Sequence, residues 1–253
     1  MCTVTYIPTK NGVILTSNRD EHISRGIAFY PEFYQVNNRK LVFPKDSKAG
    51  GTWFISNEFG DTGILLNGAI EKHKPMLSYR KSRGLVLPDI FQSDSPLTAL
   101  KNYNCNGIEN FTIILWEQCV LREIQWDGEK LIMKLLDRGQ AHIWSSVTLY
   151  NKLMIAERHN WFNNWLQQNP DMTQKNVLDF HGNTHAANKE YGLLISRKNR
   201  ISTTSITSLC IEQKKVQFRH KDLLQDVESM LQYDLMNIPH INLQSINESV
   251  QKN

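Results

Sequence analysis

The sequence contains few cysteines, and none of them stands in a metal-binding pattern. Its four cysteines, among 253 residues, are Cys2, Cys105, Cys119 and Cys210. No two of them have the C-x-x-C spacing of a zinc site, and they do not form the dense pattern of a disulfide framework. The cysteine content therefore argues against a zinc-stapled or disulfide-rich small domain, and we expect neither a metal nor a cofactor.

Long apolar runs and blocks of basic charge are also absent. No apolar run approaches the roughly 18 residues of a membrane-spanning helix, and the first residues lack the pattern of a signal peptide. We therefore expect a cytoplasmic protein without a membrane span. The formal net charge of +4 is spread along the chain without a dense Lys/Arg cluster, which argues against a nucleic-acid partner.

What the chain does contain is a strong hairpin signal at its start. Thr, Val, Ile and Tyr, which favour strands, dominate the segments on either side of Asn11-Gly12, which is a turn signal. If the turn centres near residue 10, paired residues have numbers that sum to about 20, give or take one or two. On this register Cys2 lies opposite Asn18, with Asp20 diagonal to it on the same face.

Cys2 has the features of an N-terminal nucleophile. Methionine aminopeptidase accepts a small second residue, so we expect Met1 to be removed. Cys2 would then carry a free α-amino group with a pKa of about 8, beside a thiol with a pKa of about 8.5. One residue would thus hold both the nucleophile and its base. Arg19 would favour the thiolate, and Asp20 would hold the ammonium or the guanidinium in place.

Together with two further motifs, this start carries a resemblance to a known family. Met1-Cys2, Ser17-Asn18-Arg19-Asp20-Glu21 and Gly50-Gly51-Thr52-Trp53, in this order and spacing, resemble the NRDE family, the transport and Golgi organization protein 2 group. The resemblance runs from residue 1 to about residue 225. It implies an α+β fold of the N-terminal nucleophile (Ntn) hydrolase type, a four-layer αββα sandwich with two stacked antiparallel sheets between helix layers. It also implies handling of heme, acyl-CoA or lipid.

The resemblance suggests two donors to an oxyanion. Asn67 ends the apolar run Ile64-Leu65-Leu66. In related cysteine Ntn hydrolases an Asn at the end of such a strand contributes there, although Asn67-Gly68 is alternatively an ordinary β-turn. Much of the family has a Leu-Ser-Asn string where this chain has Ser145-Ser146. Either the Ser146 hydroxyl replaces the amide, or the role has moved; equally, the segment is a strand end followed by a helix start.

Three more residues are candidates for the site. The paired glycines before Thr52-Trp53 allow close backbone approach, so Trp53 is either a substrate contact or a core anchor. Asn18 is a candidate substrate contact because of its expected place opposite Cys2. Arg200, before a Ser/Thr-rich strand, resembles the second arginine of related hydrolases and would belong to the catalytic set; the alternative is an exposed turn residue.

The rest of the chain shows clear secondary-structure signals. Residues 111–137 resemble a three-strand meander, and residues 151–168 have the apolar spacing of a helix. A shorter helix is expected at residues 173–180. A last helix is predicted from apolar residues at helical spacing, which are Leu223, Val227, Met230 and Leu231.

The composition fits one globular domain. Hydrophobic residues make up 40% and charged residues 21% of the chain, which is ordinary for such a domain, and the length suffices for one large core. We expect a single domain over residues 1–236. Residues 237–253 are rich in Asn, Gln and Ser and lack a periodic apolar face, so we expect a loose tail there.

His181 and His185 are the one pair of histidines with a metal-like spacing. Two histidines four residues apart bind a metal together only if they lie on one helix. Gly182 between them argues against a helix, and no third ligand is evident. We therefore interpret this segment as a loop that borders the pocket.

Two functions fit these features. The first is a hydrolase that cleaves a non-peptide amide, or a related acyl bond, of a small molecule. The Cys2 thiolate would attack the carbonyl, Asn67 would stabilise the oxyanion, and Asp20 and Arg19 would orient and tune the centre. The second is a carrier for heme, acyl-CoA or lipid without catalysis. Heme would want an axial ligand, which Cys2, His73 or His185 would supply.

Overall fold

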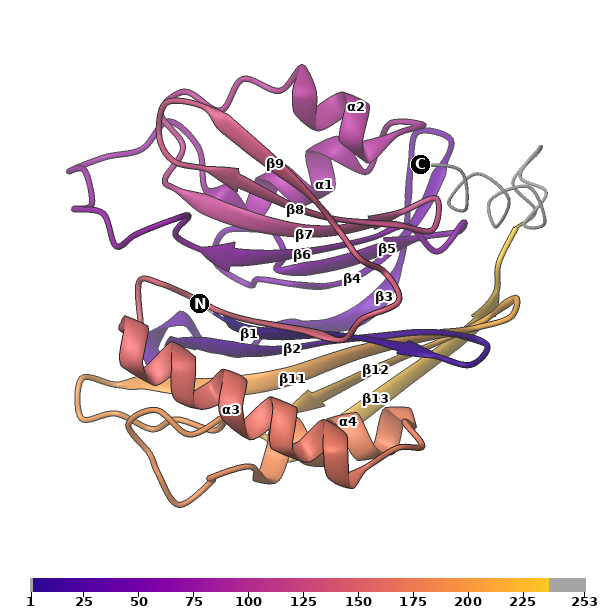
Figure 1. Ribbon diagram of the computed structural model, residues 1–253. Helices are drawn as coiled ribbons and strands as arrows, with labels where there is room; N and C mark the ends of the chain where they lie inside the picture. Colours follow the sequence, from indigo (N-terminus) through magenta and orange to yellow (C-terminus); the bar gives the residue numbers. More distant parts are fainter. Residues whose placement is uncertain (1, 237–253) are drawn as a thin grey trace, which may run out of the picture.

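Two antiparallel β-sheets, stacked face to face, form the centre of the molecule (Figure 1). The computed structural model describes residues 2–236, and of Cys2 it describes the backbone. Within these residues the N-terminal sheet has six strands, in the order β10(His142–Ser145), β1(Cys2–Thr9), β2(Gly12–His22), β11(Ile201–Glu212), β12(Lys215–Asp222) and β13(Val227–Asp234). The β3–β9 sheet has seven, in the order β3(Phe29–Val36), β4(Arg39–Lys45), β5(Phe54–Asn57), β6(Thr62–Asn67), β7(Phe111–Glu117), β8(Val120–Trp126) and β9(Leu131–Leu136).

Helices cover the outer side of each sheet. The short helices α1(Val86–Ile90) and α2(Pro96–Lys101) lie over the β3–β9 sheet, and α3(Lys152–Gln168) and α4(Gln174–Asn183) lie under the N-terminal sheet (Figure 1). Two 3-10 helices, η1(Ile23–Arg25) and η2(Arg83–Leu85), complete the described elements. The layers therefore run helix, sheet, sheet, helix, which confirms the predicted sandwich of Ntn-hydrolase type. No helix within residues 2–236 is long and apolar enough to cross a membrane.

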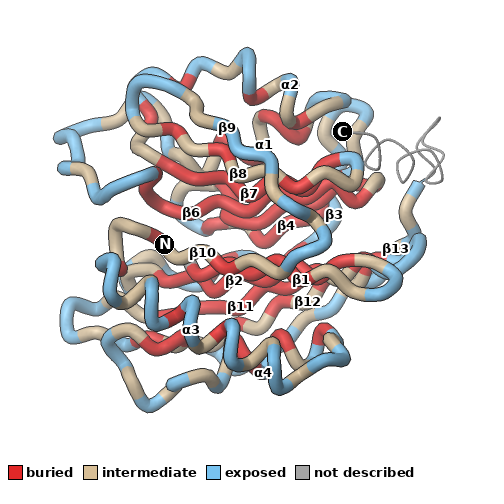
Figure 2. The backbone as a smooth tube through the Cα atoms, viewed as in Figure 1, coloured by how far each residue is buried: buried red, intermediate tan, exposed pale blue. Residues whose placement is uncertain are grey.

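The main core lies between the two sheets. Side chains alternate between the faces of a strand, so Val4 and Tyr6 of β1 and Leu15 of β2 meet Phe54 and Ile114 of the other sheet. Figure 2 shows the buried residues concentrated in both sheets. Burial of each such side chain stabilises the fold by about 1.5–3 kcal/mol. Smaller clusters fill the spaces under α1 and α2 and against α3 and α4.

The predicted hairpin is confirmed, but its register differs from the expected one by one residue. Thr9 pairs with Gly12, so paired numbers sum to 21, and Cys2 lies opposite Arg19 while Thr3 lies opposite Asn18. A one-residue shift moves side chains to the other face of a sheet. The expectation that Cys2 lies opposite Asn18, with Asp20 on the same face, is therefore wrong.

The predicted three-strand meander and the two predicted helices at residues 151–168 and 173–180 are confirmed. The meander appears as β7, β8 and β9, joined in order. The long helix appears as α3, and the Asn151 side chain caps it by accepting a hydrogen bond from the N–H of Met154 at 2.9 Å. The shorter helix, α4, extends beyond the predicted end through Gly182 to Asn183.

The last predicted helix is wrong. Val227–Asp234 is strand β13, which pairs with β12 along its whole length. Its residues alternate in burial, and Leu231 and Tyr233 pack against the main core while Met230 is exposed. Val227 and Leu231 are four residues apart, a spacing that fits one face of a helix and also one face of a strand.

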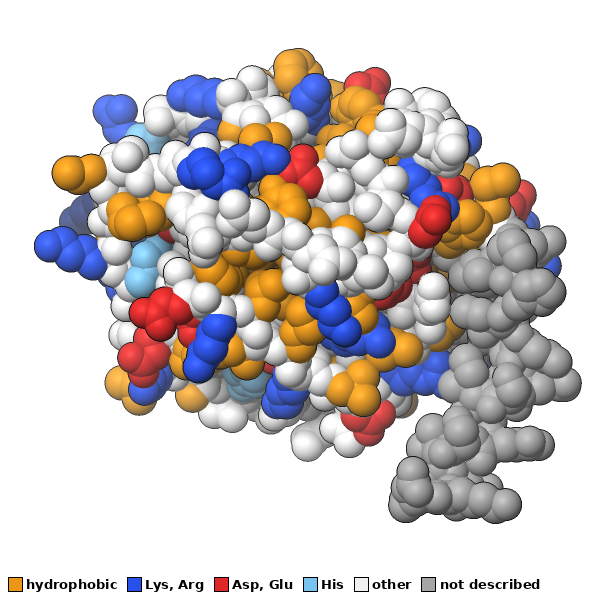
Figure 3. Space-filling view, turned by 90° about the horizontal axis from the view of Figure 1, so that it is seen from above, with side chains coloured by type: hydrophobic (Ala, Val, Ile, Leu, Met, Phe, Trp, Pro, Cys, Tyr) orange, Lys and Arg blue, Asp and Glu red, His pale blue; other side chains and the backbone are white. Residues whose placement is uncertain are grey.

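The surface and the chain end complete the description. On the face shown in Figure 3, Lys and Arg side chains are spread among other residues rather than gathered into one patch. Both sheets contribute to the same core, so we keep the interpretation of one domain over residues 1–236. The predicted loose tail, residues 237–253, lies outside the described residues.

Candidate functional site

A cavity of about 280 Å³ opens beside the end of β2 and is lined by several arginine and carboxylate side chains. We call it the charged cavity. Its walls come from β2, from the loop between β4 and β5, and from the segments before α1 and β7, and they include Arg19, Glu21, Asp46, Asn67, Arg83 and Glu109. Trp53 also lines it and at the same time belongs to the main core cluster, so it anchors the core and forms part of the cavity wall.

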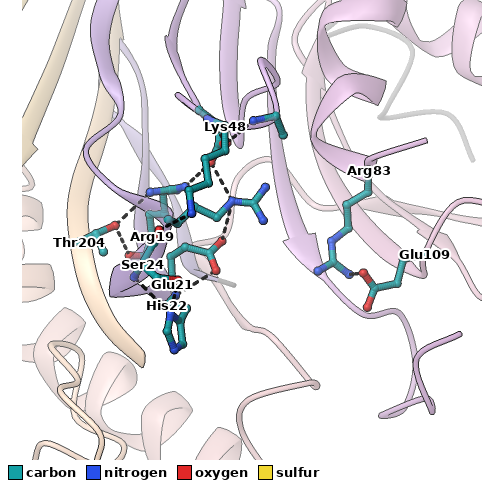
Figure 4. Close-up of polar contacts among 11 residues, drawn as sticks. Arg19, Glu21, His22, Ser24, Lys48, Arg83, Glu109 and Thr204 are labelled. Atoms are coloured by element: carbon teal, nitrogen blue, oxygen red, sulfur yellow. Dashed lines mark hydrogen bonds and ion pairs between the residues drawn. The ribbon is translucent and has the colours of Figure 1, made fainter. Parts of the chain in front are cut away.

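Arg19 is held in this cavity by a buried carboxylate and an aromatic ring. Its Nη2 lies 2.5 Å from Asp46 Oδ2, its Nη1 donates to Thr204 Oγ1 at 3.3 Å, and its guanidinium lies 4.4 Å from the centre of the Trp53 ring. Figure 4 shows Arg19 beside Thr204, with Glu21 close by. These contacts leave the guanidinium little freedom, so Arg19 presents a fixed positive charge.

Asp46 neutralises part of that charge. Burial by itself would raise the pKa of the Asp46 carboxyl, but the N–H of Ala49 and the guanidinium groups of Arg25 and Arg19 outweigh it and hold the pKa below its ordinary value. The carboxylate is therefore ionised, and Arg25 Nε lies 3.1 Å from the same Oδ2. Two arginines thus share one carboxylate oxygen at this wall.

The opposite wall carries a second ion pair. Arg83, the first residue of η2, places its Nη1 2.9 Å from Glu109 Oε2 and donates to the carbonyl of Asn110 at 3.3 Å. Figure 4 shows this pair across from Arg19 and Glu21. Burial lowers the pKa of Arg83 from its ordinary value, while Glu109 and Glu21 oppose that shift. Glu21, on the other wall, therefore favours the charged form of Arg83.

The backbone brings these walls close together through glycine. A Cβ on Gly51 would lie 2.4 Å from the backbone carbonyl of Gly84, so no other residue fits there without movement. The N–H of Thr52 donates to the same carbonyl at 2.8 Å. Gly51 therefore fixes the segment that carries Trp53 against the segment that carries Arg83, as expected for a close backbone approach.

A second cavity, of about 470 Å³, lies along the edge strand β10. We call it the β10 cavity. Leu66, Ile143 and Phe162, all almost fully buried, contribute to its walls, together with Trp144. Asn67 lines both cavities. The end of β6 therefore forms the boundary between them.

Ser146 lies at this boundary, but its hydroxyl proton is already used. Its Oγ donates to the backbone carbonyl of Asn67 at 2.7 Å and lies 2.9 Å from Thr148 Oγ1. A hydroxyl has one proton to donate, so Ser146 has none left for an oxyanion. The structure instead uses Ser146 to join the end of β10 to the end of β6, and its predicted role as a replacement donor is wrong.

The backbone position of Cys2 lies between the two cavities. Strand β1 is flanked by β10 on one side and β2 on the other. Cys2 pairs with Arg19, which lines the charged cavity, and the next residue, Thr3, pairs with Ser145, which lines the β10 cavity. The backbone of Cys2, the predicted nucleophile, thus lies between two strands whose neighbouring residues each line one of the cavities.

Asn18 and Asp20 face the other way. The Asn18 amide donates to the carbonyls of His181 at 3.2 Å and Leu193 at 2.7 Å, so it holds α4 rather than a substrate. Asp20 is fully buried and accepts hydrogen bonds from Tyr150 and Thr203, each at 2.7 Å. Neither residue lines the charged cavity, which corrects the predicted contact of Asn18 with substrate.

Burial dominates the electrostatics of Asp20. It raises the pKa of the carboxyl above the ordinary value, although Arg158 and the hydrogen bonds from Tyr150 and Thr203 oppose this. Asp20 therefore lies on the opposite face of β2 from Arg19 and joins this strand to the segments that carry Tyr150 and Thr203.

Arg200 is not part of the site. It lies in an exposed turn before β11 with a φ of 64°, and its backbone carbonyl accepts a hydrogen bond from the N–H of Ile23 at 2.9 Å. It lines neither cavity. The predicted catalytic role is wrong, and the alternative of an exposed turn residue is correct. The arginine that faces Arg19 is Arg83, from a distant segment.

Arg158 is a buried charged residue near the start of β1 that the sequence reasoning missed. It is fully buried in α3, and its guanidinium donates to Thr3 Oγ1 at 2.5 Å and to the carbonyls of Tyr191 at 3.0 Å and Gly192 at 2.6 Å. It also lies 3.5 Å from the centre of the Tyr150 ring. The sequence did contain a hint, because Arg158 follows Met154 by four residues and therefore lies on the same apolar face of the predicted helix.

The histidines considered for a metal or for heme have other partners. His181 belongs to α4 rather than to a loop at the pocket, and its ring nitrogens lie 2.8 Å from Thr5 Oγ1 and 2.6 Å from Asn18 Oδ1. His185 stacks on Trp161, and His73 pairs with Glu109 at 3.3 Å. Among the residues whose side chains the structure describes, no group of three or more His, Cys, Asp or Glu could hold a metal ion.

Comparisons with known proteins agree with this architecture. Residues 1–217 match the model of a family described as Transport and Golgi organisation 2. The fold is similar to that of a Caenorhabditis elegans N-acylethanolamine-hydrolyzing acid amidase ortholog, with a TM-score of 0.58 and 9% identity over 82% of this chain and 92% of that chain. A C2A mutant of conjugated bile acid hydrolase from Clostridium perfringens gives a TM-score of 0.48 and 11% identity over 96% of this chain and 100% of that chain. A comparison with curated protein sequences finds no match.

Proposed function

Because the chain belongs to the Transport and Golgi organisation 2 family and has the fold of Ntn hydrolases, we propose that it hydrolyses an amide or related acyl bond of a small molecule, with Cys2 as the nucleophile. The observation that carries this proposal is the register of β1, which puts Cys2 opposite Arg19 and between two cavities. The two halves of a substrate, on either side of the cleaved bond, would then each occupy one cavity.

The proposed reaction has two steps. After removal of Met1, the α-amino group of Cys2 takes the thiol proton, and the thiolate attacks the carbonyl carbon. The carbon–nitrogen bond breaks, and the amine leaves with the proton that the α-amino group returns. Water then attacks the thioester, with the same amino group as base, and the carboxylic acid and free thiol are formed.

Asn67 and Arg19 have separate roles in this proposal. The side chain of Asn67, at the boundary of the two cavities, donates a hydrogen bond to the oxyanion of each tetrahedral intermediate. Arg19 stabilises the thiolate opposite it. Because Asp46 lies 2.5 Å from Arg19, we expect a smaller depression of the Cys2 thiol pKa than an unpaired arginine would cause.

Asp20 supports the centre as a positioning residue. Its hydrogen bonds to Tyr150 and Thr203 tie β2 to the segment after β10 and to β11. These strands set the distance between Arg19 and the start of β1. Trp53, beneath the Arg19 guanidinium, forms the floor against which substrate rests.

The proposal is tested by turnover of a chromogenic amide, decanoyl-p-nitroanilide, together with a panel of acyl-CoAs. We expect p-nitroaniline release by the wild type, none by Cys2→Ala and little by Cys2→Ser, because a hydroxyl beside the same weak base is a poorer nucleophile. Cys119→Ala, which changes a thiol in the turn between β7 and β8 that lines neither cavity, is the matched control and should retain activity. If Cys2→Ala releases p-nitroaniline as fast as the wild type, Cys2 is not the nucleophile. If acyl compounds or heme bind tightly without any turnover, the protein is a carrier instead.

A further inference from the structure

The two cavities differ in the charge of their walls. The charged cavity is lined by four cationic side chains, Arg19, Arg25, Lys81 and Arg83, and by three carboxylates, Glu21, Asp46 and Glu109. Lys81 is paired with Asp89, which lies outside the lining, so the three arginines are balanced by the three carboxylates. An anionic group entering this cavity is therefore recognised by hydrogen-bond donors of the arginines rather than by a surplus of charge.

Arg83 has unused hydrogen-bond donors in that cavity. Its Nη1 serves both Glu109 and the carbonyl of Asn110, whereas its Nη2 and Nε donate to no other residue whose side chain the structure describes. A guanidinium has five N–H donors in a planar fork, and an edge of that fork matches a carboxylate. Because Glu109 and Gly84 hold this segment in place, the free edge of Arg83 is oriented before a ligand arrives.

The β10 cavity has a different character. Its buried walls include the apolar side chains of Leu66 of β6, Ile143 of β10 and Phe162 of α3, and the polar residues Asn67, Thr112 and Ser146 lie at the end near β6. The charged groups that line it, Glu123 and Lys134, lie on β8 and β9 and are only partly buried or exposed. A hydrocarbon chain gains free energy by leaving water for such walls.

We propose that the substrate is an amide with an apolar acyl half, which occupies the β10 cavity, and an amine half that carries a carboxylate, which binds Arg83 in the charged cavity. This inference rests on the proposed function, because it takes the bond at Cys2 as the point that divides the two halves. N-acyl amino acids are the simplest compounds of this class. The leaving amine then departs through the charged cavity, while the acyl chain stays in the β10 cavity as the thioester forms.

Three amides of similar length test this proposal. N-decanoylglycine has the proposed arrangement, N-decanoylethanolamine lacks the carboxylate, and N-decylsuccinamic acid has the carboxylate on the acyl half and the apolar chain on the amine half. We expect the wild type to have a kcat/KM for N-decanoylglycine at least about tenfold above that for the other two, as is usual when a site is built to pair with a polar group of the substrate.

Arg83→Gln should remove this preference. Its kcat/KM for N-decanoylglycine should fall about tenfold or more, while that for N-decanoylethanolamine stays within about twofold. A structural disturbance would lower both values together, so the ratio distinguishes the two explanations. Arg200→Gln is the matched control, since Arg200 is exposed and lines neither cavity, and its ratio should equal that of the wild type. Arg83→Lys should restore part of the preference.

Several outcomes would overturn the inference. Equal kcat/KM values for N-decanoylglycine and N-decanoylethanolamine would show that the carboxylate is not recognised. A preference for N-decylsuccinamic acid would show that the two halves bind in the opposite cavities. An unchanged ratio in Arg83→Gln would show that Arg83 does not bind the carboxylate. If no amide is cleaved, the proposed function fails, and the inference is then decided by binding. Calorimetric titration of Cys2→Ala with N-decanoylglycine should show binding that the added Arg83→Gln change weakens about tenfold or more; equal affinity would sink it.

Discussion

Replacement of Arg158 by Met should cost more stability than any other single arginine change tested against it. The guanidinium is fully buried and donates to Thr3 Oγ1 and to the carbonyls of Tyr191 and Gly192. Methionine has a similar volume but no donors, so the Thr3 hydroxyl and two backbone carbonyls would lose a partner, and buried Asp20 would lose the arginine that favours its ionised form. Leaving these hydrogen-bond acceptors without a donor and the buried carboxylate without a nearby cation costs about 3–5 kcal/mol in total.

Urea unfolding measures this cost. A domain of this kind has a total stability of about 5–15 kcal/mol, so the variant should fold but unfold at a clearly lower urea concentration. With a slope of about 2–3 kcal/mol per molar urea, the midpoint should fall by roughly 1–2 M. Arg80→Met is the matched control, since Arg80 is exposed and donates only to loop carbonyls, and it should lower stability by less than about 1 kcal/mol.

The loss should also depend on pH in a defined direction. Removing Arg158 raises the folded pKa of Asp20 further above its unfolded value, and a raised folded pKa gives stability that is present at low pH and lost as pH rises through it. The difference between wild type and Arg158→Met should therefore be larger at pH 7 than at pH 4. A loss no greater than that of Arg80→Met, or a difference that grows as pH falls, would refute the reasoning.

Three further predictions concern the thiols, the buried histidines and the last strand. Limiting iodoacetamide should label Cys2 before Cys210, because burial raises the pKa of the Cys210 thiol to about 11; peptide mapping that finds Cys210 labelled first would contradict this. Burial lowers the pKa of His220 to about 4, so stability should fall as pH drops from about 6.5, where the unfolded histidine takes up its proton, towards 4. His220→Phe should reduce that slope by up to about 1.4 kcal/mol per pH unit, and equal slopes in urea titrations would count against it. Leu231→Lys should cost about 2–4 kcal/mol in urea unfolding and Met230→Lys under about 1, whereas similar costs would contradict strand β13.

Local patterns predicted the elements well. The turn at Asn11-Gly12, the meander over residues 111–137 and the helix after Asn151 are encoded by neighbouring residues, and each is present. The failure at Val227–Asp234 has the same origin, because a few apolar residues at mixed spacing fit two periods. Pairing with β12, which sequence spacing does not report, decided in favour of the strand.

The site was harder to predict, because its geometry depends on register and on distant segments. A shift of one residue in the hairpin, from a sum of 20 to one of 21, put Arg19 rather than Asn18 opposite Cys2. Arg83 meets Glu109 only because the η2 segment and the start of β7 come together in the fold. Arg200 resembled a functional arginine in its sequence context, yet its turn is exposed.

The central claim is that Cys2 forms a covalent acyl intermediate, and the most direct measurement is mass spectrometry of acid-quenched protein after incubation with decanoyl-p-nitroanilide. We predict that the mature chain begins at Cys2 and that a decanoyl group appears on the N-terminal peptide and disappears as substrate is consumed. Cys2→Ala should carry no decanoyl group under the same conditions. Met1 retained on nearly all molecules of a protein that still cleaves the amide, or a decanoyl group on another residue, would contradict the account.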